Sequence, residues 1–177
     1  DLTISFWLKS STTGQWNPVT SLTPNKFNST GQENWFGVAA DQNGIVKGND
    51  QVTGNGRYEF EKKASNKALS GQWEYVTVVV DGQTAGSKTG FVKGTMYVNG
   101  EVYASGNICA AAITDNTQVY MGVNIWGDNG ITGAVDDYKY ANYAWTAEEV
   151  KAVYQSYEKA MIVTAAAPEK SKIQLSL

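Results

Sequence analysis

Apolar and polar residues alternate with a period of two along most of the chain, as expected for strands that bury one face. The first residues show this most clearly, because Leu2, Ile4, Phe6 and Leu8 alternate with Thr, Ser and Trp. Similar runs recur at short spacing between clusters of Gly, Asn and Asp. They predict strands at residues 2–8, 19–22, 35–40, 45–46, 57–62, 73–80, 90–98, 101–104, 119–122 and 135–140.

The segments between these runs have the composition of turns and loops. Asn-Gly pairs at 43–44 and 99–100 are typical of two-residue hairpin turns. Residues 47–56 are rich in Gly, Asn and Asp and are expected to form a loop, whereas residues 108–113 fit no single pattern. Evenly spaced strands joined by hairpin turns predict an all-β fold, an antiparallel β-sandwich.

The period changes once, near the end of the chain, where a helix is predicted over residues 146–161. Thr146 and Glu149 are spaced as a capping box, in which each side chain covers a backbone N–H at the start of a helix. An apolar stripe follows at helical spacing and consists of Val150, Val153, Tyr154, Tyr157 and Met161. We therefore expect one amphipathic helix to close the sandwich.

The residues after this helix are expected to lie outside the domain, which we place at residues 1–162. Residues 163–177 begin with the composition of a linker, and residues 173–177 alternate like a strand. That short strand either pairs back onto the sandwich or begins another domain, and the sequence slightly favours the second. Because the chain starts within a strand at Asp1, we expect it to be a piece of a longer protein.

Composition excludes several classes of function. The chain has 177 residues, a net charge of -3 and no long run of one sign, so a nucleic-acid partner is not expected. No apolar run approaches the length that a membrane-spanning helix requires. The absence of His excludes Ser-His and Cys-His nucleophile pairs, and the single cysteine, Cys109, cannot form an internal disulfide.

Five blocks of sequence resemble one known family. Residues 1–9, 69–82, 94–106, 121–129 and 133–150 follow, in order, the pattern of the laminin-G-like, concanavalin-A-like jelly-roll domains. The last block looks like the closing strand of that family, followed by its Ala-Glu-Glu helix. The resemblance covers most of residues 1–150 and implies a jelly roll of two antiparallel sheets.

The resemblance also implies a biological setting. Bacterial members of the family are often accessory modules of secreted, multidomain carbohydrate-active enzymes, in which many bind glycans and a structural calcium is common. The chain departs from the family in lacking the strand that usually precedes residues 2–8. Either the piece starts late, or residues 173–177 take the place of that strand.

Aromatic residues in polar loops are the candidates for binding a glycan, because sugar C–H faces stack on rings while amides and carboxylates bind the hydroxyls. The alternative is that these rings cap the ends of the core, and it is preferred for the strand residues Trp7 and Trp73 and for Trp145. The predicted ligand-binding residues are Trp16, Trp35, Asn124, Trp126, Asp128 and Asn129.

Calcium is the one cofactor that the family suggests, and it would be structural. It binds several oxygens from Asp, Asn and backbone carbonyls, often from separate loops. Asp136 and Asp137, on the predicted closing strand, are the candidate ligands. A strand-edge acid bonded to backbone N–H groups is an equally good interpretation.

Catalysis is not expected. Related jelly-roll glycanases carry alternating acids on one strand that face the cleft together. Glu59 and Glu61 alternate in this way, but the third acid is missing and two lysines follow. They are interpreted as a solvated strand face.

The sequence therefore predicts a non-catalytic, lectin-like carbohydrate-binding module of a larger secreted or cell-surface bacterial protein, of the kind found as an accessory module of a glycoside hydrolase. Its partners would be a glycan and the neighbouring domains of the same polypeptide. The first alternative is a structural spacer that docks on a neighbouring catalytic domain without binding sugar. A jelly-roll glycanase is the least favoured alternative.

Overall fold

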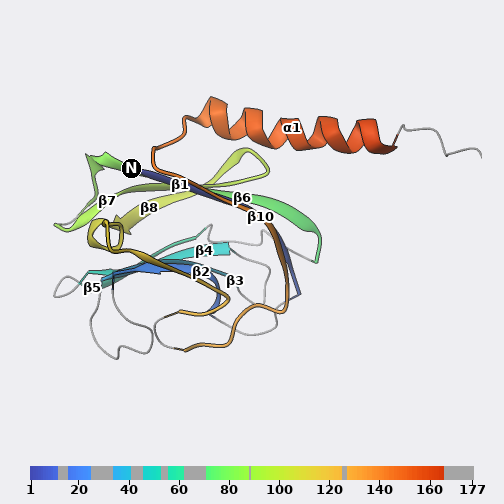
Figure 1. Cartoon of the computed structure of the whole chain (residues 1–177). Coiled ribbons are helices and arrows are strands. Elements are labelled where there is room, and N and C mark those ends of the chain that lie inside the picture. The colour runs from blue at the N-terminus through green and yellow to red at the C-terminus, as the bar shows by residue number, and fades with distance from the viewer. Residues whose placement is uncertain are drawn as a thin grey trace, which may run out of the picture.

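The computed structural model describes residues 1–11, 16–24, 34–40, 46–52, 56–61, 71–87, 89–124 and 127–165. Ten strands, one short 3₁₀ turn, η1 (Ala110–Ala112), and one helix, α1 (Ala147–Ala165), lie in this part of the chain. The strands form two sheets packed face to face, and α1 lies across the outside of one of them (Figure 1). The predicted sandwich with one closing helix is confirmed.

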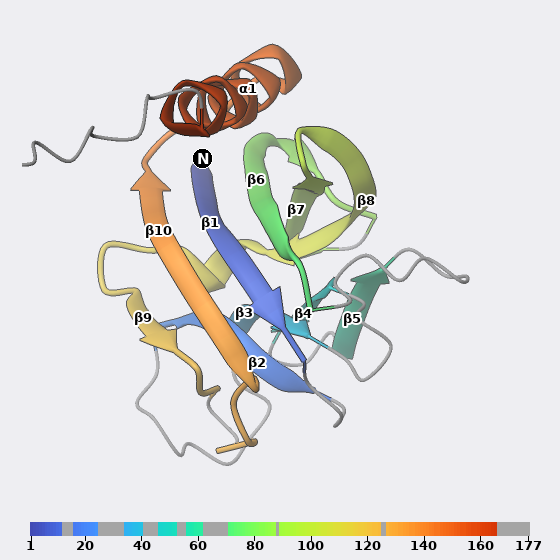
Figure 2. The same ribbon diagram turned by 90° about the vertical axis from the view of Figure 1, so that its right-hand side faces the viewer.

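The sheet beneath α1, called here the first sheet, has five antiparallel strands. Their order is β10 (Gly133–Ala141), β1 (Leu2–Ser10), β6 (Trp73–Ala85), β7 (Phe91–Val98) and β8 (Glu101–Cys109). The first and last segments of the sandwich are thus neighbours, because β1 pairs with β10 (Figure 2). The turn at Asn99-Gly100 joins β7 to β8 and has positive φ at both residues, as a two-residue hairpin turn requires.

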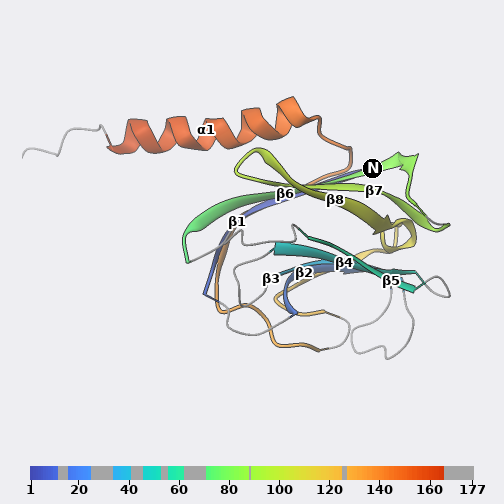
Figure 3. The ribbon, with the colours of Figure 1, turned by 180° about the vertical axis from the view of Figure 1, so that it is seen from behind.

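The second sheet also has five antiparallel strands and lies on the far side of the core from α1 (Figure 3). Their order is β5 (Gly56–Glu61), β4 (Val46–Val52), β3 (Trp35–Ala40), β2 (Asn17–Thr23) and β9 (Gln118–Met121). Most of β4 falls in the segment predicted to be a loop, and that prediction is wrong. The strand forms despite its Gly, Asn and Asp residues because β3 and β5 pair with its backbone on both sides.

Alternation along the strands builds the core between the sheets. Leu2, Ile4, Phe6 and Leu8 of β1 are fully buried there, together with residues such as Phe36 of β3. The polar residues on the other face of β1, Thr3 and Ser5, are buried as well. Both faces of β1 are therefore covered at these positions, one by the core and the other by α1 and the segment that precedes it.

Four aromatic rings join α1 to the first sheet, and we call them the ring cluster: Trp7, Tyr75, Tyr154 and Tyr157. Trp7 lies 5.2 Å from Tyr75 and 5.5 Å from Tyr157 between ring centroids. Tyr154 stacks on Tyr75 at 6.3 Å. These distances are typical of favourable ring contacts, so Tyr154 and Tyr157 of the predicted apolar stripe lie on the face that α1 buries.

The start of α1 follows the predicted capping box. The Glu149 carboxylate accepts from the Thr146 backbone N–H at 2.7 Å, and the Thr146 hydroxyl accepts from the Glu149 N–H at 3.2 Å. Val150 is fully buried beside Val79, with Trp145 packed against them. The helix continues to Ala165, four residues beyond the predicted end.

Two further features of the fold bear on function. Trp73, expected to cap an end of the core, lies at the start of β6 with 44% of its surface exposed. Alternation places it on the outer face of the sheet, opposite Lys9 of β1. Within the described residues, no helix is both long enough and apolar enough to span a bilayer.

Candidate functional site

The start of β2 and the loop after β9 meet at one end of the sandwich. The Asn17 side chain donates through Nδ2 to the backbone oxygens of Asn129, at 2.8 Å, and of Gly130, at 3.1 Å. Residues more than a hundred positions apart in the sequence are thereby held together. The predicted candidates Trp16, Asp128 and Asn129 all belong to this junction. We call these three residues, with Asn17 and Asn124, the end-loop cluster.

The buried Asn124 side chain fixes the conformation of the loop after β9 by hydrogen bonds. Its amide donates to Asp128 Oδ2 at 2.8 Å, and its oxygen accepts from the Asp128 backbone N–H at 3.1 Å. Its own backbone oxygen accepts from Gly127 N–H, at a residue whose φ of 73° suits glycine. Asn124 is buried, whereas Asp128 and Asn129 are exposed. Asn124 is thus a positioning residue, and the other two are available to a ligand.

Trp16 precedes β2 and is half-buried, with a φ of 59° that few bulky residues adopt. Beside it, Asn17 Oδ1 is buried and accepts no hydrogen bond from the described residues. Unusual backbone geometry in a non-glycine residue persists only where the surrounding structure holds it. The end-loop cluster therefore combines a constrained indole with exposed amide and carboxylate groups.

Trp35 lies elsewhere. It starts β3, near the opposite end of β2, since Leu22 pairs with Phe36 and Asn17 with Ala40. Five strand residues separate these positions, a distance of about 17 Å. The Trp35 ring covers Gly37 and is only 4% exposed, and its indole N–H has no described partner. Its burial argues against the predicted stacking role, so we leave Trp35 out of the site. Trp126 lies outside the described residues.

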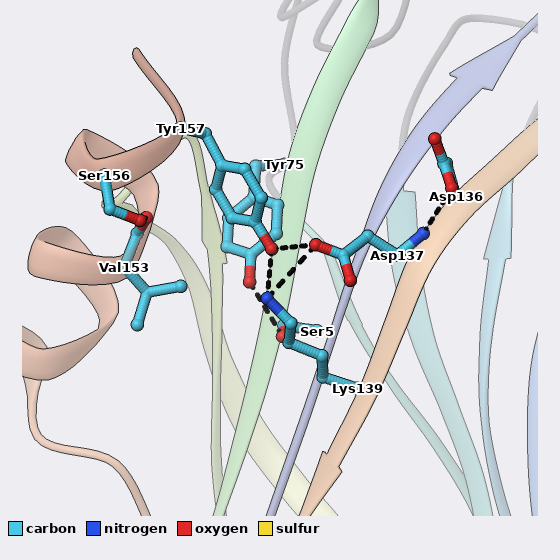
Figure 4. Close-up of polar contacts among 8 residues, drawn as sticks. All are labelled: Ser5, Tyr75, Asp136, Asp137, Lys139, Val153, Ser156 and Tyr157. Carbon is cyan, nitrogen blue, oxygen red and sulfur yellow. Dashed lines mark hydrogen bonds and ion pairs between the residues drawn. The ribbon is translucent and has the colours of Figure 1, made fainter. Parts of the chain in front are cut away.

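Asp136 and Asp137, the candidate metal ligands, lie on β10 at a bulge in its pairing with β1. Asp137 has a φ of 49°, and its backbone N–H donates to Asp136 Oδ1 at 2.7 Å. The bulge turns the Asp137 side chain toward α1 (Figure 4). The equally weighted alternative, an acid bonded to a backbone N–H, therefore describes Asp136.

The Asp137 carboxylate contacts two donors instead of other acids. Lys139 Nζ lies 3.1 Å from it, and the Tyr157 hydroxyl of α1 donates to the same oxygen (Figure 4). Lys139 also donates to the Tyr157 hydroxyl and lies 4.7 Å from the centre of its ring. The Tyr157 hydrogen bond, assisted by Lys139, holds the pKa of Asp137 below its usual range.

The tyrosines of this contact are held in the neutral form. Burial, followed by the hydrogen bond to Asp137, raises the pKa of Tyr157 to about 12. Burial also raises the pKa of Tyr75 to about 12, although its hydroxyl donates to Ser5 Oγ at 2.8 Å. We call Asp137, Lys139 and Tyr157 the helix latch, because they connect β10 directly to α1.

These contacts do not fit a calcium site at Asp136 and Asp137. Calcium binds six to eight oxygens, yet the described residues contain no group of three acidic, His or Cys side chains placed to hold a metal. A lysine ammonium beside the Asp137 carboxylate also opposes a second cation there. Calcium elsewhere on the chain stays a prediction.

The sequence pattern did not reveal the helix latch. Tyr157 was assigned to the apolar stripe and Lys139 to a strand, and no motif links them. The sequence separation of Lys139 and Tyr157 gives one usable signal. A helix that folds back over its preceding strand brings its second and third turns over that strand, so these two residues can meet. The bulge that aims Asp137 has no sequence signature that we recognise.

Comparisons with known proteins agree with this architecture. The family model of the concanavalin A-like lectin/glucanases superfamily matches residues 1–151. No curated protein sequence matches the chain.

Several solved structures share the fold. The CBM40 of Ruminococcus gnavus IT-sialidase, bound to α2,3-sialyllactose, is 16% identical with a TM-score of 0.65, over 86% of this chain and 82% of that one. Domain 4 of AbnA, a GH43 extracellular arabinanase from Geobacillus stearothermophilus, in complex with arabinotriose, is 19% identical with a TM-score of 0.64, over 87% and 66%. A SAP-like pentraxin from Limulus polyphemus is 19% identical with a TM-score of 0.58, over 86% and 69%.

Proposed function

The chain belongs to the concanavalin A-like lectin/glucanases superfamily, and we propose that it is a non-catalytic module that binds a glycan at the end-loop cluster. One observation carries the proposal: Asn17 joins the start of β2 to the loop after β9, so that Trp16, Asp128 and Asn129 share one end of the sandwich. An indole face with adjacent amide and carboxylate groups suits the C–H face and hydroxyls of a sugar.

The covering of the outer faces of both sheets favours the end-loop cluster as the glycan site. α1 and the ring cluster cover much of the outer face of the first sheet. Every residue of β2 and β3 is buried, so the outer face of the second sheet is covered at those strands too. The loop end keeps exposed polar groups beside an indole, which the buried residues of β2 and β3 do not offer.

Two solved structures of this fold support a glycan as the ligand, since one is in complex with arabinotriose and the other is bound to sialyllactose. A binding role without catalysis agrees with the chemistry of the chain. It contains no His, and the carboxylate of Asp128 is bonded to Asn124 while that of Asp137 is bonded to the helix latch. We expect modest affinity, because a site at a loop end buries little ligand surface.

The same proposal includes the larger protein to which this chain would belong. One of these structures comes from an extracellular arabinanase and another from a sialidase. We place this chain likewise in a larger secreted or cell-surface protein, where it would hold a neighbouring catalytic domain near its polysaccharide.

The alternative function is docking on a neighbouring domain without binding sugar. The exposed indole of Trp73 favours it, because this residue lies on the outer face of the first sheet, where a neighbouring domain could cover it. If docking is the function, substitution of Trp73 should weaken the association with the neighbouring domain.

The test is retention on polysaccharide and oligosaccharide matrices, including arabinan and sialyllactose. We expect Trp16→Ala to weaken binding about tenfold, equivalent to roughly 1.4 kcal/mol. Tyr143→Ala is the matched control, since Tyr143 is an aromatic residue with 50% of its surface exposed beyond the other end of β10. Failure of every matrix to retain the parent chain would refute the proposal, as would equal binding by the Trp16 and Tyr143 variants.

A further inference from the structure

The two sheets leave apolar side chains exposed along one side of the sandwich, where β9 and β10 are the last strands. Val119 and Met121 of β9 are 44% and 45% exposed, although they pair with Leu22 and Thr20. Leu22 belongs to the core, and Thr20 bonds the Tyr138 hydroxyl between the sheets. Val119 and Met121 therefore face inward, yet the side of the sandwich leaves them open.

The same holds on the other sheet. Tyr140 of β10 pairs with Ile4, a fully buried core residue, and is itself 53% exposed. Tyr138, two residues earlier, lies over Thr20, which pairs with Met121. Tyr140, Val119 and Met121 thus line one open side between the sheets, which we call the open side. Inward-facing apolar residues that stay exposed indicate a missing neighbour.

The two edges differ in their readiness to accept another strand. β10 carries Asp136, Asp137 and Lys139 together with a bulge, all of which discourage edge pairing. β9 reads Gln-Val-Tyr-Met, has no charge and pairs with β2 without a register shift. Its outer edge is therefore the one suited to β-augmentation, in which an added strand satisfies the free backbone groups.

We propose that residues 173–177 of this chain, Ile-Gln-Leu-Ser-Leu, add to the free edge of β9 as an antiparallel strand. Their apolar residues recur at every second position, which puts Ile173, Leu175 and Leu177 on one face of an extended segment. That face matches the inward face of β9 and covers Val119 and Met121. Gln174 and Ser176 face solvent on the other side.

The direction of α1 brings the residues that follow it to the loop end of the sandwich, where β9 ends. Trp145, before the helix, bonds Thr3 at one end of β1, whereas Tyr157 bonds Asp137 further toward the start of β10. α1 therefore runs opposite to β10 and ends above the loop end (Figures 1 and 2). Because β9 runs toward the loop end, a segment leaving that end runs antiparallel to it.

The linker is long enough. Residues 166–172 separate the end of α1 from Ile173, and seven extended residues span up to about 25 Å. The tail must pass one helix layer and one sheet spacing, each about 10 Å. This span exceeds the depth of about 20 Å that separates α1 from the second sheet.

Hydrogen exchange on the full chain tests this proposal independently of any glycan. The β9 amides not bonded to β2 should exchange about tenfold faster in a chain ending at Ala165 than in the full chain. Leu175→Asp should have the same effect, because it places a charge against Val119 and Met121. Gln174→Asp, on the solvent face of the same segment, is the matched control and should keep the protection.

Equal exchange of these amides in the full and shortened chains would overturn the proposal. Sedimentation measures whether a second copy of the chain occupies the open side instead. Protection that rises with protein concentration, together with a dimer that survives removal of residues 166–177, would assign the open side to a second copy and also overturn it. Protection that is independent of concentration and lost with the tail supports the proposal.

Discussion

For single residues of this protein, the role of a side chain depends mainly on whether another segment buries it. Trp35 and Trp73 belong to the same residue type and both start strands, yet one is 4% and the other 44% exposed. The sequence predicts the opposite, with Trp35 at a ligand and Trp73 packed against an end of the core. Alternation predicts which face of a strand a residue occupies, but it does not predict which faces another segment will cover.

This difference predicts opposite effects on stability. Trp35→Ala should lower the free energy of unfolding by about 3–5 kcal/mol, because it removes a buried ring and leaves a cavity. Trp73→Ala should change it by less than about 1 kcal/mol, as is usual for exposed residues. Urea unfolding followed by circular dichroism measures both. Equal losses for the two variants would show that our assignment of burial is wrong.

Asp137 gives stability a dependence on pH. Its folded pKa is lowered by the hydrogen bond from Tyr157 and by Lys139, so its contribution is present above the unfolded pKa of about 3.9 and is lost as pH falls through the folded value. Both charged side chains are more than a third exposed, so the contribution is expected to be below about 1 kcal/mol and weakened by salt.

Asp137→Asn should therefore lower Tm at pH 7, and this difference should shrink as pH falls from 7 to 2 and the parent carboxylate becomes protonated. Thermal unfolding across this pH range measures the effect. Asp136→Asn is the control, since Asp136 contacts the backbone at the bulge and neither Lys139 nor Tyr157. A Tm difference at pH 7 that persists unchanged at pH 2 would contradict an electrostatic role for Asp137.

At the scale of elements, the sequence predicts best where local chemistry and packing agree. β1 and α1 were expected from strict alternation and from a capping box, and both are present. β4 was missed because its Gly, Asn and Asp residues favour turns, while its strand conformation depends on pairing with β3 and β5. The bulge at Asp137 was missed for a similar reason, since β1 pairs on both sides of it.

The capping box should stabilise α1 measurably. Thr146→Ala removes the hydroxyl that accepts from Glu149 N–H and should cost about 1 kcal/mol. Glu149→Gln keeps a side-chain acceptor for the Thr146 N–H and should cost less. Chemical unfolding compares the two variants. If both lose stability equally, the charge of Glu149 at the helix start matters more than the reciprocal hydrogen bonds.

In the molecule as a whole, the described residues cover much of the surface of both sheets. α1 covers the outside of the first sheet, β2 and β3 are buried on both faces, and the end-loop cluster joins distant segments at one end. The sequence indicated Trp16, Asp128 and Asn129 as separate polar-loop candidates. It could not show that they meet, because the Asn17 amide that joins them binds backbone oxygens and leaves no pattern in the sequence.

The central claim, a glycan site at the end-loop cluster, is tested most directly by amide chemical shifts during titration with the oligosaccharide that the matrices retain best. We predict saturable shifts at residues 16–17 and 127–130, with residues 142–146 at the far end of β10 unaffected. Shifts confined to the outer face of the first sheet around Trp73, or no saturable shift with any retained glycan, would contradict the account.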